Sequence, residues 1–83
     1  QRRYVELGEI YFSQKSYNAA IPYYKRLVKA KKINDQYLIR LGLCYYYTRK
    51  IAEASKVFSF LDKNDKLTDS LRLVYFDILK QSG

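Results

Sequence analysis

Apolar residues recur at every third or fourth position along most of the chain, in stretches separated by short polar segments. This spacing gathers apolar side chains on one face of an α-helix, whereas a half-buried strand would alternate at every second position. With only three glycines and one proline, the chain has few turn signals of the kind that separate many short strands. The pattern predicts an all-α protein of about five helices, spanning roughly 2–13, 17–30, 36–48, 51–61 and 69–81.

Polar residues at the predicted boundaries indicate where helices begin. Ser16 is the expected N-cap of the second helix, and Thr68 or Asp69 that of the fifth, because short oxygen-bearing side chains accept from free backbone N–H groups. Asn34 or Asp35 is expected to cap the third helix.

The chain resembles itself when shifted by 34 residues. The first and second thirds share the segment Leu-Gly-x-x-Tyr, and further apolar positions align in the same register. A skeleton of this length recurring at a fixed period indicates a repeat architecture. The aligned pairs include Leu7 and Leu41, Gly8 and Gly42, Tyr11 and Tyr45, Ala20 and Ala54, Tyr24 and Phe58, and Leu27 and Leu61.

This skeleton resembles the tetratricopeptide repeat, whose pattern combines Leu-Gly-x-x-Tyr with a later alanine and an aromatic residue four positions after it. The resemblance implies a right-handed stack of antiparallel helix pairs within one domain. It divides the chain into repeat 1 at 1–33, repeat 2 at 34–66 and a capping or half-repeat helix at 67–83. The usual tryptophan is Tyr4 or Leu38 here, and lysine replaces the closing proline. Pro22 falls inside the second helix, which the register predicts to continue with a slight bend.

Each repeated glycine lies inside a predicted helix, where it costs about 1 kcal/mol relative to alanine. We expect close packing of the two helices of a repeat to offset this cost, with Gly8 opposite Ala20 and Gly42 opposite Ala54. The predicted packing residues are Leu7, Gly8, Tyr11, Ala20, Tyr24, Leu41, Gly42, Tyr45, Ala54 and Phe58.

The fifth helix matches the repeat least well. Phe76 stands where the earlier repeats have glycine, so this helix could not accept another helix at close range. We favour a capping helix, which suits the atypical end of a repeat stack. The alternative is a repeat cut short, and a start at Gln1 without any methionine leads us to expect a fragment of a longer protein.

Residues for catalysis or metal binding are scarce. The chain has no histidine and one cysteine, and it lacks a glycine-rich phosphate loop. Cys44 aligns with Ile10, so we interpret it as a buried core residue. A lone cysteine fits a reducing compartment without establishing one, and no apolar run is long enough to span a bilayer. We expect no enzymatic activity, no cofactor and no metal.

The first helices of the repeats are expected to line a groove, because stacked hairpins present such extended surfaces. Apolar and aromatic residues dominate the predicted stripe, and exposed apolar surface marks interaction sites. The sequence therefore predicts a non-catalytic scaffold that binds a peptide or partner helix; self-association of so short a stack stays open. The predicted contact residues are Arg2, Val5, Glu9, Phe12, Ile39, Arg40, Leu43, Tyr46 and Leu73.

The resemblance allows one partner class to be tested. Some tetratricopeptide modules clamp the C-terminal carboxylate of a heat-shock chaperone with basic and amide side chains. The corresponding positions here are Val5, Glu9, Arg40, Ser70 and Val74, of which only Arg40 is basic. We therefore reject a carboxylate clamp and expect an apolar partner, with an acidic group meeting Arg2 or Arg40.

Charge supports an alternative. The formal net charge is +8, and no acidic residue occurs between Glu9 and Asp35. Lys25, Lys29 and Lys32 in this gap form a basic patch along one side of the second helix. Such a patch suits nucleic acid, anionic lipid or an acidic protein. We place nucleic acid below a protein partner, because no base-reading motif is present.

Overall fold

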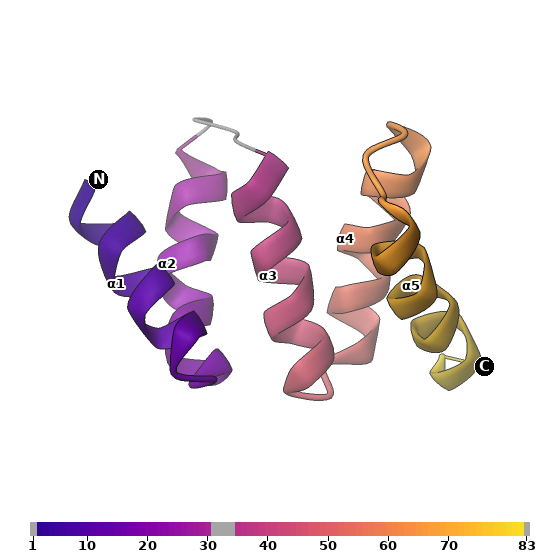
Figure 1. The fold of residues 1–83 in the computed structure, drawn as a ribbon, viewed down its shortest axis with the longest axis horizontal. Coiled ribbons are helices and arrows are strands. Elements are labelled where there is room, and N and C mark those ends of the chain that lie inside the picture. Colours follow the sequence, from indigo (N-terminus) through magenta and orange to yellow (C-terminus); the bar gives the residue numbers. More distant parts are fainter. Residues whose placement is uncertain (1, 31–34, 83) are drawn as a thin grey trace.

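A computed structural model describes residues 2–30 and 35–82 (Figure 1). Within these ranges the chain folds entirely into helices and short connections, without a strand. The helices follow one another in chain order along the longest axis of the molecule, and the two termini lie at opposite ends (Figure 1). They are α1 (Arg2–Ser13), α2 (Tyr17–Lys29), α3 (Asp35–Tyr47), α4 (Ile51–Lys63) and α5 (Asp69–Gln81).

Most predicted helix boundaries agree with the structure to within one or two residues. Thr68 is the N-cap of α5, and its hydroxyl oxygen accepts from the Leu71 backbone N–H at 3.3 Å. Ser16 occupies the N-cap position of α2, but its side chain makes no capping hydrogen bond. The prediction that Asp35 caps α3 is wrong, because Asp35 is already the first helical residue; Asn34 lies outside the described residues. Pro22 leaves α2 unbroken.

The five helices form two layers. Helices α1, α3 and α5 make up one layer, and α2 and α4 lie behind it (Figure 1). Consecutive helices pack against each other, so each second-layer helix lies between two first-layer helices. This is the antiparallel hairpin stack that the 34-residue period predicts.

The core runs along the interface between the layers. Apart from two half-buried members, Leu7 and Tyr11, the predicted packing residues are buried. Tyr24 and Phe58 stand at equivalent repeat positions, and both are fully buried. Ile78 of α5 is also fully buried, and Tyr75 stacks on Phe58 with ring centroids 6.1 Å apart. Helix α5 therefore extends the same core.

The glycines make room for aromatic rings. A Cβ atom added to Gly42 would lie 2.8 Å from Cε1 of Phe58, and one added to Gly8 would lie 3.2 Å from Cζ of Tyr24. We predicted that Gly8 faces Ala20 and that Gly42 faces Ala54, and this is wrong. The atom nearest to each glycine belongs instead to the aromatic residue one helical turn after the alanine. Small size at these positions is still what the packing requires.

Three helices end in the same turn. Lys15, Arg49 and Asp65 each adopt a left-handed backbone, with φ of 61°, 64° and 57°. The next residue donates its N–H to a carbonyl five residues earlier, as Lys50 does to Tyr45 at 2.8 Å. This is the Schellman arrangement, in which glycine is the usual left-handed residue.

We therefore expect Arg49→Gly to stabilise the protein. The left-handed conformation costs a non-glycine residue about 1–2 kcal/mol of stability, and glycine removes this cost. The greater conformational freedom of glycine in the unfolded chain offsets part of that gain. The expected net change is about 0.5–1 kcal/mol, measured by urea unfolding. Lys56→Gly, inside α4, is the control and should destabilise by about 1 kcal/mol. A lower unfolding midpoint for Arg49→Gly would contradict the turn geometry.

The outer side of α5 remains apolar. Leu73, Phe76 and Leu79 are 72%, 59% and 45% exposed, respectively, and the Lys80 ammonium lies 4.8 Å from the centre of the Phe76 ring. Capping repeats usually carry a polar outer face. Whether α5 ends the stack or begins another repeat stays a prediction.

Candidate protein-interaction face

The predicted contact residues lie on the first-layer helices, and we call the surface that they form the A-helix face. Most of its apolar members are half-buried and pack against the core; Leu73 is the most exposed. The Arg2 side chain lies outside what the structure describes. The described members are Val5, Glu9 and Phe12 on α1, Ile39, Arg40, Leu43 and Tyr46 on α3, and Leu73 on α5.

An ion pair joins α1 to α3 across this face. Arg40 Nη1 lies 3.2 Å from Glu9 Oε2, and both side chains are partly shielded from water. The Arg40 guanidinium also lies over the ring of Phe12, 4.4 Å from its centre. Glu9, Arg40 and Phe12 are all predicted to contact a partner, but here they contact one another. The Arg40 guanidinium is therefore already paired with a carboxylate.

The Glu9 carboxylate also reaches the core. The Tyr24 hydroxyl donates to Glu9 Oε1 at 2.8 Å, although the Tyr24 ring is fully buried. Burial raises the pKa of Tyr24 far above its ordinary value, and the hydrogen bond to Glu9 raises it further. Glu9 thus fixes both Arg40 on the surface and Tyr24 beneath it.

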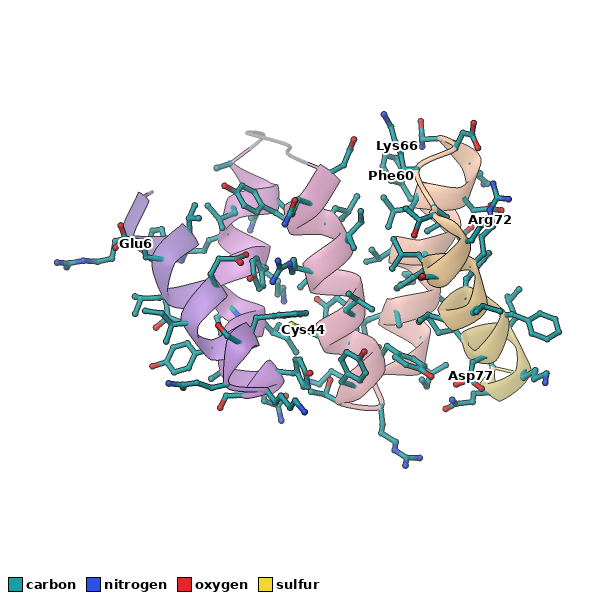
Figure 2. All side chains as sticks on the ribbon, viewed as in Figure 1. Glu6, Cys44, Phe60, Lys66, Arg72 and Asp77 are labelled. Carbon is teal, nitrogen blue, oxygen red and sulfur yellow. The ribbon has the colours of Figure 1, made fainter. Side chains whose placement is uncertain are left out.

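A second polar contact joins α3 to α5. The Tyr46 hydroxyl donates to Asp77 Oδ2, and the Gln81 side chain donates to the same oxygen at 2.8 Å. Both hydrogen bonds stabilise the ionised carboxylate, so they lower the pKa of Asp77. Asp77 lies toward the C-terminal end of α5 (Figure 2). These residues, with Tyr47 and Arg49, line an open hollow of about 360 Å³.

The two bridges were not predicted, although the repeat contains a signal for them. Glu9, Leu43 and Asp77 are spaced by 34 residues, so they occupy equivalent positions on the three first-layer helices. Two carboxylates consequently stand on either side of Leu43. The partners of these carboxylates, Arg40 and Tyr46, could not be assigned from spacing alone, since their long side chains reach across neighbouring helices.

Two of the three lysines predicted as a basic patch lie on α2, in the other layer. Lys25 and Lys29 are both exposed, and Lys32 lies outside the described residues. They border an open pocket of about 630 Å³, which extends to Leu41 and Tyr45 of α3. The basic patch and the A-helix face are therefore separate surfaces.

Cys44 lies in the interior of the stack, as predicted, although its repeat equivalent Ile10 is 50% exposed (Figure 2). Burial raises the pKa of its thiol to about 11, so the thiolate is scarce at neutral pH. Among the residues that the structure describes, no three His, Cys, Asp or Glu side chains gather closely enough to hold a metal ion. No helix in the described part is long and apolar enough to cross a membrane.

Comparison with known families adds to this geometry. Residues 1–34, which contain α1, α2 and the Gly8–Tyr24 contact, match the family model described as "Tetratricopeptide repeat". The first hairpin is thus a tetratricopeptide repeat. Its second hairpin reproduces the same skeleton in register, with Gly42 against Phe58. Comparisons with curated proteins and with solved structures gave no match.

The family that the first hairpin matches indicates a class of function. These repeats are generally non-enzymatic and mediate interactions between proteins. Each hairpin contributes one pair of helices, and stacking aligns the first helices into an extended surface. In this chain that surface is the A-helix face, with its half-exposed apolar residues and its two polar bridges.

Proposed function

We propose that the protein is a non-catalytic scaffold that binds a peptide or a partner helix on the A-helix face. The observation that carries this proposal is the partial exposure of Ile39, Leu43 and Tyr46 along one side of α3, the central first-layer helix. Apolar and aromatic side chains at the centre of a surface are the usual anchors of a protein interface. The partner that suits them presents apolar side chains to α3.

The two bridges support the proposal because they hold the face rigid. Glu9 and Arg40 connect α1 to α3, while Tyr46 and Asp77 connect α3 to α5. A partner that meets side chains already fixed by such contacts loses less conformational freedom on binding. The bridges also restrict the partner, since an acidic group would have to compete with Glu9 for Arg40. We accordingly place apolar contact ahead of charge in this interaction.

Peptide selection tests the proposal. Peptides that bind the immobilised chain would first be selected from a displayed random library. Their affinities for the unmodified chain and for the double variant Ile39→Ala/Leu43→Ala would then be compared by fluorescence anisotropy. We expect affinity to fall by at least about tenfold, which corresponds to roughly 1.4 kcal/mol, because central apolar anchors dominate binding energy. Far-UV circular dichroism and thermal unfolding must show that the variant remains helical and folded under the binding conditions.

Phe60→Ala is the matched control. Phe60 is apolar and 53% exposed, but it lies on α4, outside the A-helix face. This variant should retain binding to within about twofold, as expected when no interface contact is removed. Equal affinity for Ile39→Ala/Leu43→Ala and the unmodified chain would overturn the proposed face.

A further inference from the structure

An open hollow lies away from the A-helix face, between α2 and α3. It has a volume of about 630 Å³ and draws apolar side chains from both helices. Ile21, Leu41 and Tyr45 are almost fully buried, while Val28 is half-buried. Binding pockets for organic groups commonly have this size and an apolar lining. The repeat skeleton does not require the hollow, and the A-helix face does not include it.

The hollow lies on the opposite side of α3 from the proposed binding face. On a helix with 3.6 residues per turn, Leu41 and Tyr45 point roughly 160° away from Ile39 and Leu43. The four residues thus divide α3 into two surfaces. A partner could occupy the hollow without displacing one bound on the A-helix face.

Positive charge borders the hollow along α2. Lys25 and Lys29 are exposed one helical turn apart, and neither ammonium pairs with a carboxylate among the described residues. Like charges at this spacing repel each other. Arg26 also lines the hollow, where its guanidinium donates to the Tyr4 hydroxyl at 3.0 Å, a contact that leaves its charge unneutralised. In the described part of the chain, no ion pair neutralises Lys25, Arg26 or Lys29 on this border.

The hollow therefore has a positive border on α2 and an apolar floor. This polarity favours a ligand whose acidic groups face α2.

We propose that this hollow is a second binding site, which takes an acidic amphipathic segment of a partner protein. One or two aliphatic or aromatic side chains of the segment fill the space over Ile21, Val28 and Leu41, while its carboxylates pair with Lys25 and Lys29. Nucleic acid offers phosphates for the lysines but no apolar side chain for the floor. The inference concerns a different surface from the proposed function, so each can fail without the other.

A titration with defined peptides tests the second site. The probe is a synthetic helical peptide of about 18 residues, or five turns, with leucine on one face and glutamate on the other. Added to the ¹⁵N-labelled 83-residue chain at low salt, it should shift the amide signals of Ile21, Val28 and Leu41 most strongly. Lys25→Glu/Lys29→Glu should weaken binding at least tenfold, because attraction becomes repulsion on the α2 border.

Lys56→Glu/Lys63→Glu is the matched control. This double variant changes the net charge by the same amount on α4, and Lys63, like Lys29, lies in the last turn of its helix. Its affinity for the leucine–glutamate peptide should stay within about twofold of that of the unmodified chain. Both double variants are checked for retained helicity by circular dichroism.

Several results would overturn the second site. One is a failure of the leucine–glutamate peptide to shift these amides, and another is equal weakening by the two double variants. A peptide with serine in place of leucine should bind more weakly. If it binds equally tightly, the peptide is held by charge attraction alone and the apolar floor contributes nothing. Strongest shifts at Ile39 and Leu43 would place the probe on the A-helix face, and equal shifts with a single-stranded oligonucleotide would favour nucleic acid.

Discussion

Gly42→Leu is expected to lower the free energy of unfolding strongly, by about 3 kcal/mol or more. Even a Cβ atom at this position would lie 2.8 Å from Cε1 of Phe58 and 2.9 Å from Cγ1 of Val57. Phe58 is fully buried and cannot turn away. The overpacking cost of about 1–3 kcal/mol or more exceeds the gain in helix propensity of about 1 kcal/mol, and leucine adds three further carbons. Urea unfolding followed by circular dichroism measures the loss.

A pair of smaller substitutions separates packing from propensity. Gly42→Ala and Gly8→Ala gain the same propensity, but the added Cβ at Gly8 comes no closer than 3.2 Å, near the end of the Tyr24 ring. Gly42→Ala should therefore be the less stable of the two by about 1–2 kcal/mol. Equal stabilities, or a folded Gly42→Leu with an unchanged unfolding midpoint, would show that Gly42 does not face Phe58.

Phe58→Ala should be comparably severe, with a loss of about 3–5 kcal/mol. The Phe58 ring is fully buried, lies against Gly42 of α3 and stacks on Tyr75 of α5. Its removal leaves a cavity where three helices meet. The total stability of a small domain is about 5–15 kcal/mol, so this one ring supplies a large share. The measurement is again urea unfolding, with the slope checked for two-state behaviour.

Phe60→Ala is the control for this experiment. It removes the same side chain two positions along α4, where the ring is 53% exposed, and should change stability by no more than about 0.5 kcal/mol. Similar losses from Phe58→Ala and Phe60→Ala would contradict the packing of α4 against α3 and α5.

Periodicity predicted the backbone well because it reports local geometry. The 34-residue shift identified both hairpins, and apolar spacing set most helix ends to within one or two residues. The burial of Tyr24 and Phe58 followed from their shared repeat position. The left-handed turns at Lys15 and Arg49 were not predicted, because lysine and arginine give no sign of that conformation.

Contacts between side chains of different helices were harder to predict. The rings of Tyr24 and Phe58, rather than the nearby alanines, fill the space beside the glycines, because their size extends them one turn along the helix. The pairing of Glu9 with Arg40 and of Tyr46 with Asp77 depends on rotamers and on the angle between helices, which a single sequence does not contain. The hollow beside Lys25 likewise forms only when α2 and α3 come together.

The most direct test of a partner-binding A-helix face is amide chemical-shift mapping of the ¹⁵N-labelled chain with a peptide selected for binding. We expect the largest shifts at Ile39, Leu43 and Tyr46 on α3, with smaller ones at Phe12 on α1. Shifts confined to α4, or to Ile21 and Val28 on α2, would contradict binding through this face.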